Sequence, residues 1–345
     1  MPDPMPITMP IHDAMLAEAR RFNQTLARMP RFGMRGRWTP NLVQALLRLS
    51  QLGADRKLNR RGIVVERRVV KTTAADVPLR ILRPRGPVSG IVLDIHGGGW
   101  VIGNPQMNDL LNAGYVETCD VAVVSVDYRL ASRAPITALI DDCVDAARWL
   151  LDDGLPEYAG LPVVVIGESA GGHLAAATLQ RLASWPALLQ RIVGAVLYDG
   201  VYDLAGTPSV HAAPASTLVL DGPRMVPGLR MLTPGLDDAA RRQPSLSPLF
   251  GNLDGMPPAL MFVGVRDPLI DDTLEMAQRW RRVAEVELNV LPEAPHGFIH
   301  FPTAMARATS AHSQAWIRAR LAEKRLDTQP ILATAAENIA LSAFR

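Results

Sequence analysis

The sequence predicts an α/β fold: an eight-stranded, mostly parallel sheet with helices on both faces and a helical cap. Strand-like and helix-like segments alternate along most of the chain, which is the pattern of a doubly wound sheet. The runs 121–126 and 163–166 are almost continuously apolar, as strands are when helices cover both faces of a parallel sheet. A length of 345 residues, 48% of them hydrophobic, suits one large domain with an appendage.

Eight segments have the composition of strands, and helical patterns lie between several of them. The first two strand candidates, 63–70 and 77–83, mix apolar with charged residues, which indicates an antiparallel edge hairpin with one face in water. The later strands are expected to be parallel, with any ligand at their carboxyl ends. The remaining strand candidates are 91–95, 121–126, 162–166, 193–198, 259–263 and 286–291, and the helical patterns are 136–152, 171–184, 271–284 and 306–324.

A Gly-Glu-Ser-Ala-Gly segment, residues 167–171, joins the strand candidate 162–166 to a helix-compatible stretch of small residues. A Gly-x-Ser-x-Gly between a strand and a helix is typical of a nucleophile elbow, where the turn is so sharp that glycines are needed two positions either side of the serine. In such an elbow Ser169 is exposed at the end of the strand. The alternative for the pentapeptide alone is a small-residue turn without chemistry.

Three consecutive glycines, Gly97, Gly98 and Gly99, follow the strand candidate 91–95 and leave their backbone N–H groups unobstructed. Acyl transfer builds negative charge on a carbonyl oxygen, and fixed N–H donors aimed at that oxygen form an oxyanion hole. Gly98 and Gly99 are the leading donor candidates and Gly97 is less favoured. Ala170 supplies a third donor, because it follows the serine at the first turn of a helix. The alternative is a flexible glycine loop.

An acid and a histidine follow the serine in the chain order that this chemistry requires. Asp267 lies just beyond the strand candidate 259–263, and His296 lies just beyond 286–291. In the predicted triad Ser169 attacks an acyl carbon, His296 takes the hydroxyl proton and passes it to the leaving group, and Asp267 orients the imidazole.

Alternatives remain for two of these roles. Asp271 or Asp272 could be the acid if the loop is placed one turn away, and His300 is close enough in sequence to rival His296. The remaining histidines are expected to have solvated or structural roles: His12, His173, His211 and His312.

With five motifs in order, the chain resembles the hormone-sensitive lipase-like esterases of the α/β-hydrolase superfamily over about residues 60–322. The resemblance implies an α/β-hydrolase fold and a carboxylic ester hydrolase with no cofactor or metal, favouring short or medium acyl chains. The motifs are His-Gly-Gly-Gly-Trp at 96–100, Asp-Tyr-Arg-Leu-Ala at 127–131, Gly-Glu-Ser-Ala-Gly-Gly at 167–172, Asp-Pro-Leu at 267–269 and Pro-His-Gly-Phe at 295–298.

Two departures from the family pattern matter. Asp-Tyr-Arg-Leu-Ala is commonly followed by Pro-Glu, whereas here Ser-Arg-Ala-Pro follows at 132–135. We expect that loop to be structural, with Asp127 paired to Arg129. Glu168 stands before the serine where many relatives carry aspartate, which points to a subgroup and not to a substrate.

The chain is expected to divide into an N-terminal helical cap segment, 1–58, a catalytic domain, 59–325, and a C-terminal tail, 326–345. A cap insertion at about 200–250 interrupts the catalytic domain and is rich in Pro, Gly, Met and Leu. The two cap segments together are expected to form a lid with an apolar acyl slot, which Trp100 also lines unless it only packs the glycine loop. The tail is expected to form a short extra helix or to be mobile.

Composition argues against several other classes of protein. A formal net charge of +2, with no basic patch interleaved with aromatics, argues against a nucleic-acid partner. Cys119 and Cys143 have neither metal-ligand nor redox spacing, so free thiols are expected. No secretory signal and no membrane-spanning run is apparent, which favours a cytoplasmic location.

The sequence therefore predicts a serine carboxylesterase that acts on a small-molecule ester through an acyl-enzyme. Hydrolysis of a lactone, amide or carbamate is the alternative within the same machinery, and a non-catalytic ligand receptor is a remote one. A homodimer through 286–291 and 306–324, placed at the edge of the sheet, is a further expectation.

Overall fold

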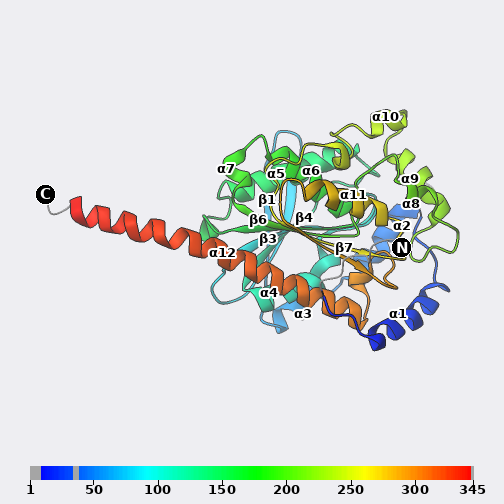
Figure 1. The fold of residues 1–345 in the computed structure, drawn as a ribbon, viewed down its shortest axis with the longest axis horizontal. Helices are drawn as coiled ribbons and strands as arrows, with labels where there is room; N and C mark the ends of the chain where they lie inside the picture. Colours follow the sequence, from blue (N-terminus) through cyan, green and yellow to red (C-terminus); the bar gives the residue numbers. More distant parts are fainter. Residues whose placement is uncertain (1–8, 34–38, 343–345) are drawn as a thin grey trace.

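The computed structural model describes residues 9–33 and 39–342, and its centre is an eight-stranded sheet (Figure 1). Every strand candidate of the sequence is a strand in the structure, with bounds that differ by at most two residues. The strands are β1 (Val64–Val70), β2 (Val77–Arg83), β3 (Gly90–Ile95), β4 (Val121–Val126), β5 (Val163–Glu168), β6 (Ile192–Tyr198), β7 (Ala259–Gly264) and β8 (Val286–Leu291).

Helices cover both faces of this sheet and one of its ends. All four helical patterns of the sequence are helices in the structure. The helix Asp109–Cys119 was not predicted, and it is the longest unpredicted helix that packs on the sheet. The helices are α1 (Asp13–Leu26), α2 (Thr39–Ser50), α3 (Ala54–Arg60), α4 (Asp109–Cys119), α5 (Ile136–Leu151), α6 (Ala170–Leu182), α7 (Pro186–Leu189), α8 (Pro208–His211), α9 (Met225–Leu232), α10 (Asp238–Arg241), α11 (Ile270–Trp280) and α12 (Ala304–Ser342).

The strand order is β1-β2-β4-β3-β5-β6-β7-β8. The predicted hairpin is confirmed, because β1 pairs antiparallel with β2, and β2 also runs antiparallel to β4. From β4 onward all neighbours are parallel. The chain moves from β3 to β4 on one side and to β5 on the other, so the strand order reverses between β3 and β5, where α/β sheets bind ligands at the carboxyl ends.

Alternate residues of the strands point into two separate cores. In β4, Val124 and Val126 join the core under α5, α6 and α11, whereas Val121 and Val123 join the core under α4 and α12. Figure 1 shows these two layers of helices on opposite faces of the sheet. The buried central strands therefore explain the continuous apolar runs of the sequence.

Two glycines let α12 lie close against one face of the sheet. A Cβ at Gly194 of β6 would lie 2.6 Å from the Trp316 ring, and a Cβ at Gly90 of β3 would lie 2.5 Å from Leu321. The expectation that 306–324 lies at the edge of the sheet is therefore wrong, because this segment packs across the face; β8 does lie at the edge.

The C-terminal tail does not form a separate short helix, because α12 continues past Pro330 to Ser342 (Figure 1). The alanine-rich composition of this stretch favours a helix. Figure 1 shows the C-terminal part of α12 extending away from the sheet. Among the helices of residues 9–33 and 39–342, none combines the length and apolar content needed to cross a bilayer.

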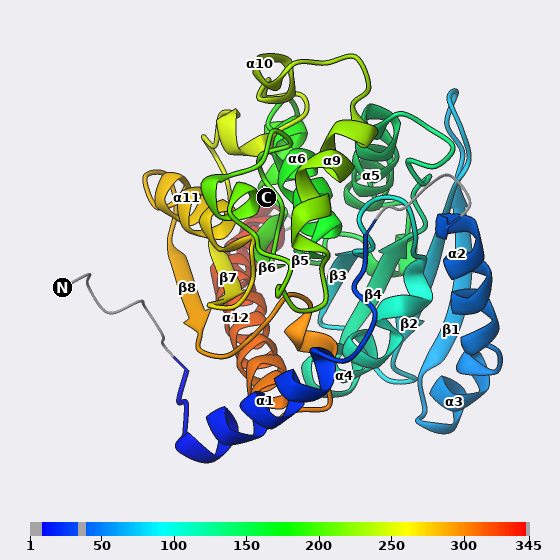
Figure 2. The same cartoon turned by 90° about the vertical axis from the view of Figure 1, so that its right-hand side faces the viewer.

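The N-terminal segment and the 200–250 insertion meet at the end of the sheet where the parallel strands finish. Figure 2 shows α1, α2 and α9 around this end. Phe32 forms a parallel bridge with Leu220, in which its N–H donates to Val219 O and its carbonyl accepts from Asp221 N–H. This bridge joins two segments that are almost two hundred residues apart in sequence.

The contact between Gly194 and Trp316 gives a stability prediction. We expect Gly194→Ala to lower the free energy of unfolding by about 1–3 kcal/mol, because the new methyl group must displace the indole ring. Chemical denaturation measures this change. Gly86→Ala is the matched control, because nothing lies within 4 Å of a Cβ at that position. Equal stability of the two variants would contradict the packing described for α12.

Candidate active site

Ser169 connects β5 to α6 in a backbone conformation that few residues other than glycine adopt, with φ 55° and ψ −120°. The glycines on either side are required by close contacts. A Cβ at Gly167 would lie 2.4 Å from the carbonyl oxygen of Gly171, and one at Gly171 would lie 2.0 Å from that of Ile95. The strand, the sharp turn and the helix are those predicted for a nucleophile elbow.

The structure brings the three predicted triad residues together. The Nε2 atom of His296 lies 2.9 Å from Ser169 Oγ, and its Nδ1 atom lies 2.8 Å from Asp267 Oδ2. Asp267 Oδ1 accepts a hydrogen bond from the N–H of Leu269 at 2.9 Å, which fixes the carboxylate. When Nδ1 donates to Asp267, Nε2 of the neutral imidazole can accept a hydrogen bond from the Ser169 hydroxyl, which is the geometry that general-base activation requires.

The electrostatic surroundings favour the charged form of His296. Burial alone would lower the pKa of this imidazole, but the Asp267 carboxylate outweighs that effect and, with smaller contributions from nearby carboxyl groups, raises the pKa to about 9. A histidine beside a buried carboxylate holds its proton more tightly. The surroundings therefore stabilise the imidazolium form of His296.

The alternative acids have other roles. Asp272 accepts hydrogen bonds from the N–H groups of Tyr202 and Asp203 and from the Thr207 hydroxyl. Asp271 accepts from the N–H of Ser209. Both aspartates hold the chain that follows β6, and the structure places Asp267 beside His296.

The rival histidine, His300, lies in the cavity wall but contacts a different group. Its Nε2 atom lies 3.3 Å from Glu168 Oε2. Burial alone would raise the pKa of Glu168, but His300 beside it lowers that pKa, so this carboxyl group stays ionised. The acid before the nucleophile therefore forms an ion pair of its own in the cavity wall.

The predicted oxyanion donors lie beside Ser169. Within the described residues, the N–H groups of Gly98, Gly99 and Ala170 form no hydrogen bond and remain available to a ligand. Gly98 and Gly99 line the same cavity as Ser169, whereas Gly97 lies behind them, with Glu168 Oε2 at 2.4 Å from the place of a Cβ. The geometry thus favours Gly98 and Gly99 over Gly97.

Trp100 both lines the cavity and packs the glycine loop. Its φ is 63° and its side chain is buried, with Nε1 donating to His173 Nδ1 at 3.2 Å. His173 Nε2 in turn donates to Leu246 O at 2.7 Å. Burial lowers the pKa of His173 to about 4, so this histidine is neutral and structural, as expected.

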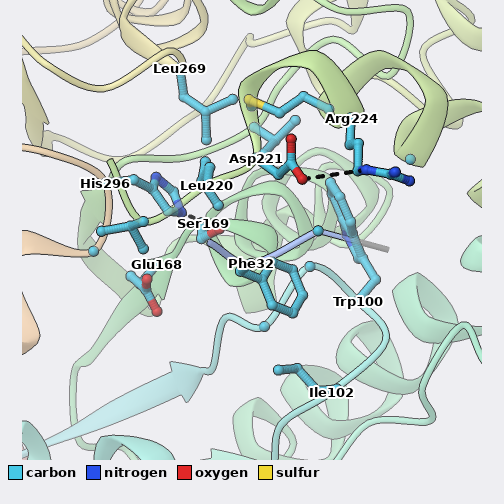
Figure 3. Close-up of a pocket in the computed structure, with 18 of the residues that line it drawn as sticks. Phe32, Trp100, Ile102, Glu168, Ser169, Leu220, Asp221, Arg224, Leu269 and His296 are labelled. Atoms are coloured by element: carbon cyan, nitrogen blue, oxygen red, sulfur yellow. Dashed lines mark hydrogen bonds and ion pairs between the residues drawn. The ribbon is translucent and has the colours of Figure 1, made fainter. Parts of the chain in front are cut away.

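Ser169 lies at the base of a cavity of about 300 Å³ whose wall is mostly apolar (Figure 3). Residues that precede β1 and residues between β6 and β7 supply much of this wall. Figure 3 shows Phe32 and Leu220 near the serine, with the ion pair of Asp221 and Arg224 farther along the wall. The apolar lining residues are Phe32, Trp100, Ile102, Val219, Leu220, Met225, Leu229, Leu232 and Leu269.

Sequence reasoning missed Phe32 and Asp199. Nothing in the local sequence marks Phe32, because only the fold brings it to the cavity. Asp199 directly follows β6, as Asp267 follows the end of β7, and its place after a parallel strand is a signal that could have identified it. Within the described residues, Asp199, Asp267 and His296 are the one group with ligand atoms close enough for a metal, but Asp267 and His296 already bond each other.

One loop differs from its predicted arrangement. Arg129 pairs with Asp142 of α5, at 2.7 Å from its guanidinium, and not with Asp127. The backbone N–H of Arg129 donates to the same carboxylate. The helix thus holds this loop, and the predicted pairing of Asp127 with Arg129 is wrong, because the distant partner Asp142 could not be seen from the local motif.

Comparison with known proteins agrees with this fold and site. The family model described as an alpha/beta hydrolase fold matches residues 92–300. Carboxylesterase NlhH of Mycobacterium tuberculosis is 32% identical over 278 residues, which span 77% of this chain and 85% of that protein. Ethyl acetate hydrolase of Pseudomonas putida is 28% identical over 241 residues, 67% of this chain and 74% of that protein.

Solved structures give the same result. An esterase of Pyrobaculum calidifontis superposes with a TM-score of 0.75 at 25% identity and covers 90% of this chain and 99% of its own. The esterase LipW of Mycobacterium marinum gives a TM-score of 0.77 at 25% identity, over 88% and 96% of the two chains.

The chain therefore belongs to the α/β-hydrolase family. Within it, the chain is a carboxylic ester hydrolase of the hormone-sensitive lipase-like group, as the resemblance implied.

The raised pKa of His296 predicts how activity depends on pH. A general base works in its neutral form, so kcat/KM should rise as pH increases through the pKa of this imidazole. Because Asp267 raises that pKa, we expect the midpoint of the rise to lie above about 6.5, the ordinary value for histidine. Measuring kcat/KM from pH 5 to 10, corrected for spontaneous hydrolysis, tests this. A midpoint below the ordinary value would contradict the described coupling.

Proposed function

We propose that this ester hydrolase uses Ser169 as its nucleophile and forms an acyl-enzyme on it. The observation that carries this proposal is the continuous chain of hydrogen bonds from Asp267 through His296 to Ser169 Oγ at the base of the cavity. A serine whose base is itself oriented by an acid is the recurring arrangement for acyl transfer.

In the first half of the reaction, Ser169 Oγ bonds to the acyl carbon while His296 Nε2 takes its proton. The carbonyl oxygen becomes negative and receives hydrogen bonds from the N–H groups of Gly98, Gly99 and Ala170. His296 then returns the proton to the leaving alcohol. Water attacks the acyl-enzyme in the second half, with His296 again taking the proton and passing it to Ser169 Oγ.

We further propose short or medium hydrophobic acyl groups as substrates. A cavity of about 300 Å³ corresponds to roughly ten water-sized volumes, which leaves room for a small acyl group and its alcohol. The mostly apolar wall favours binding of a hydrocarbon acyl group over a charged one. The printed name of one relative, an ethyl acetate hydrolase, also supports a small ester.

We assign the role of cap to residues 1–58 and to the insertion at about 200–250. Phe32 from the first segment and Leu220, Met225 and Leu229 from the second lie in the cavity wall above the catalytic domain. The bridge between Phe32 and Leu220 holds the two segments together, so each can influence substrate choice through the other.

The nucleophile is tested by Ser169→Ala. We expect kcat/KM for an aryl ester to fall by about 10⁴-fold or more, because no other group in the variant can form the acyl-enzyme. Ser184→Ala is the matched control, since Ser184 lies exposed in a turn after α6. Full activity in Ser184→Ala beside normal turnover in Ser169→Ala would overturn the assignment.

The substrate range is tested with aryl esters whose acyl chains run from two to sixteen carbons. We expect kcat/KM to be highest at roughly eight carbons or fewer, because longer chains exceed the cavity. Leu229→Ala should move the optimum to longer chains, whereas Leu236→Ala, outside the cavity, should not. An optimum at long chains in the unmodified enzyme would contradict this. Matched amide, lactone and carbamate substrates distinguish the alternative acyl groups.

A further inference from the structure

A second aspartate, Asp199, lies beside the triad and has no role in the mechanism described so far. It directly follows β6, and its side chain is fully buried. Its φ of 47° is in the left-handed region, which Asp and Asn tolerate better than most other residues. The backbone N–H of Asp199 donates to Phe262 O at 2.9 Å, which ties this turn to β7.

The carboxyl group of Asp199 contacts the loop that carries the base. Its Oδ2 atom accepts a hydrogen bond from the N–H of Gly297, the residue after His296, at 3.0 Å. A carboxylate oxygen of Asp199 lies within 4.8 Å both of a carboxylate oxygen of Asp267 and of a ring nitrogen of His296. Oδ1 has no hydrogen-bond partner among the described residues, a costly condition for a buried oxygen.

When two carboxyl groups are buried beside one imidazole, a single negative charge on the pair is more stable than a negative charge on each group, because the two charges would repel each other. Asp267 has the better partners for that charge, because it accepts from His296 Nδ1 and from the N–H of Leu269. Burial and the charge of Asp267 raise the pKa of Asp199 well above the usual range, and Glu168 acts in the same direction, against a smaller lowering by His296 and by the Gly297 N–H. The two hydrogen bonds of Asp267 therefore stabilise negative charge on that carboxyl group, whereas burial beside Asp267 disfavours negative charge on Asp199.

We propose that Asp199 is a positioning residue for His296 and a second acid for it. Its carboxyl group accepts a hydrogen bond from Gly297 N–H and so anchors the loop that carries His296. When Asp267 is uncharged, as in an Asp267→Asn variant, Asp199 becomes the carboxylate beside the imidazole. In that event Asp199 releases its proton to water, and its negative charge takes the place of the lost one. The inference rests on the proposed function, since it assumes that His296 is the base.

Asparagine substitutions separate charge from shape at both positions. Asn at 199 can still accept from Gly297 N–H and tolerates the left-handed backbone, so Asp199→Asn removes the acid but keeps the anchor. We expect this change alone to lower kcat/KM by less than about fivefold, because Asp267 still supplies the carboxylate that bonds to His296. Asp267→Asn alone should cost about 10²–10³-fold, less than the roughly 10⁴-fold typical when a triad acid has no substitute.

The test is a double-mutant cycle measured on an aryl ester with Asp267→Asn, Asp199→Asn and the double variant. We expect Asp199→Asn to cost at least about tenfold more in the Asp267→Asn background than in the unmodified enzyme, since effects of independent sites would simply multiply. The extra loss should appear in kcat with little change in KM. The acid limb of kcat/KM should also lie at lower pH in the double variant than in Asp267→Asn, because the last carboxylate beside His296 is gone.

Asp272→Asn is the matched control, because it removes another buried carboxyl group near β6 that bonds to the 200–207 segment and not to the histidine loop. Its effect should be the same in both backgrounds, and thermal unfolding should show that every variant used is folded. Equal costs of Asp199→Asn in the two backgrounds would overturn the proposal, as would an Asp267→Asn enzyme no faster than Ser169→Ala. Normal turnover by Ser169→Ala would instead refute the serine mechanism itself.

Discussion

The rest of the site depends on the close approach of α6 to the ends of β3 and β5. At Gly171 the helix backbone passes so near the carbonyl of Ile95 that only a hydrogen atom fits between them. This contact sets the angle at which the chain leaves β5, and it holds Ser169 in its strained conformation. Because the glycine loop begins just after Ile95, the same contact places Gly98 and Gly99 in the wall of the cavity that Ser169 lines, where the proposed mechanism needs N–H donors. Gly172 extends the contact to Gly200, at the turn after β6, so the elbow is held from both sides.

Three buried carboxyl groups lie around His296, and they differ in the partners that balance their charge. Asp267 has a direct hydrogen bond to the imidazole, and Glu168 is compensated by its own ion pair with His300. Asp199 lies close to both members of the His–Asp pair and forms no ion pair of its own within the part of the chain that the structure describes. The negative charge of this cluster makes the imidazolium form of His296 more stable than burial alone would allow, as the proposed proton transfer from Ser169 requires. It also costs stability, because several polar groups are taken out of water.

The cavity is assembled from segments that contribute nothing to the sheet. Phe32 comes from before β1, and the residues opposite it come from the chain between β6 and β7. Their joint wall is apolar, whereas the chemistry at its base is polar and hydrogen-bonded. In the proposed mechanism reaction and selectivity are thereby separated: the strand ends hold the reacting groups, and the proposed cap segments limit the size of the substrate.

The sequence by itself determined the alternation of strands and helices and the edge hairpin, and it predicted the three residues that the structure joins by hydrogen bonds, Ser169, His296 and Asp267. These were readable because each depends on local chemistry: apolar runs mark buried strands, and the elbow and the glycine loop need particular residues at fixed spacing. The tertiary structure decided which distant segments contact one another. It pairs Arg129 with Asp142, carries α12 across the face of the sheet, and brings Phe32 and Asp199 to the site. Only Asp199 carries a local signal, its place after a parallel strand; no local pattern names the partner in any of these contacts, because each requires two parts of the chain to meet after the sheet has formed.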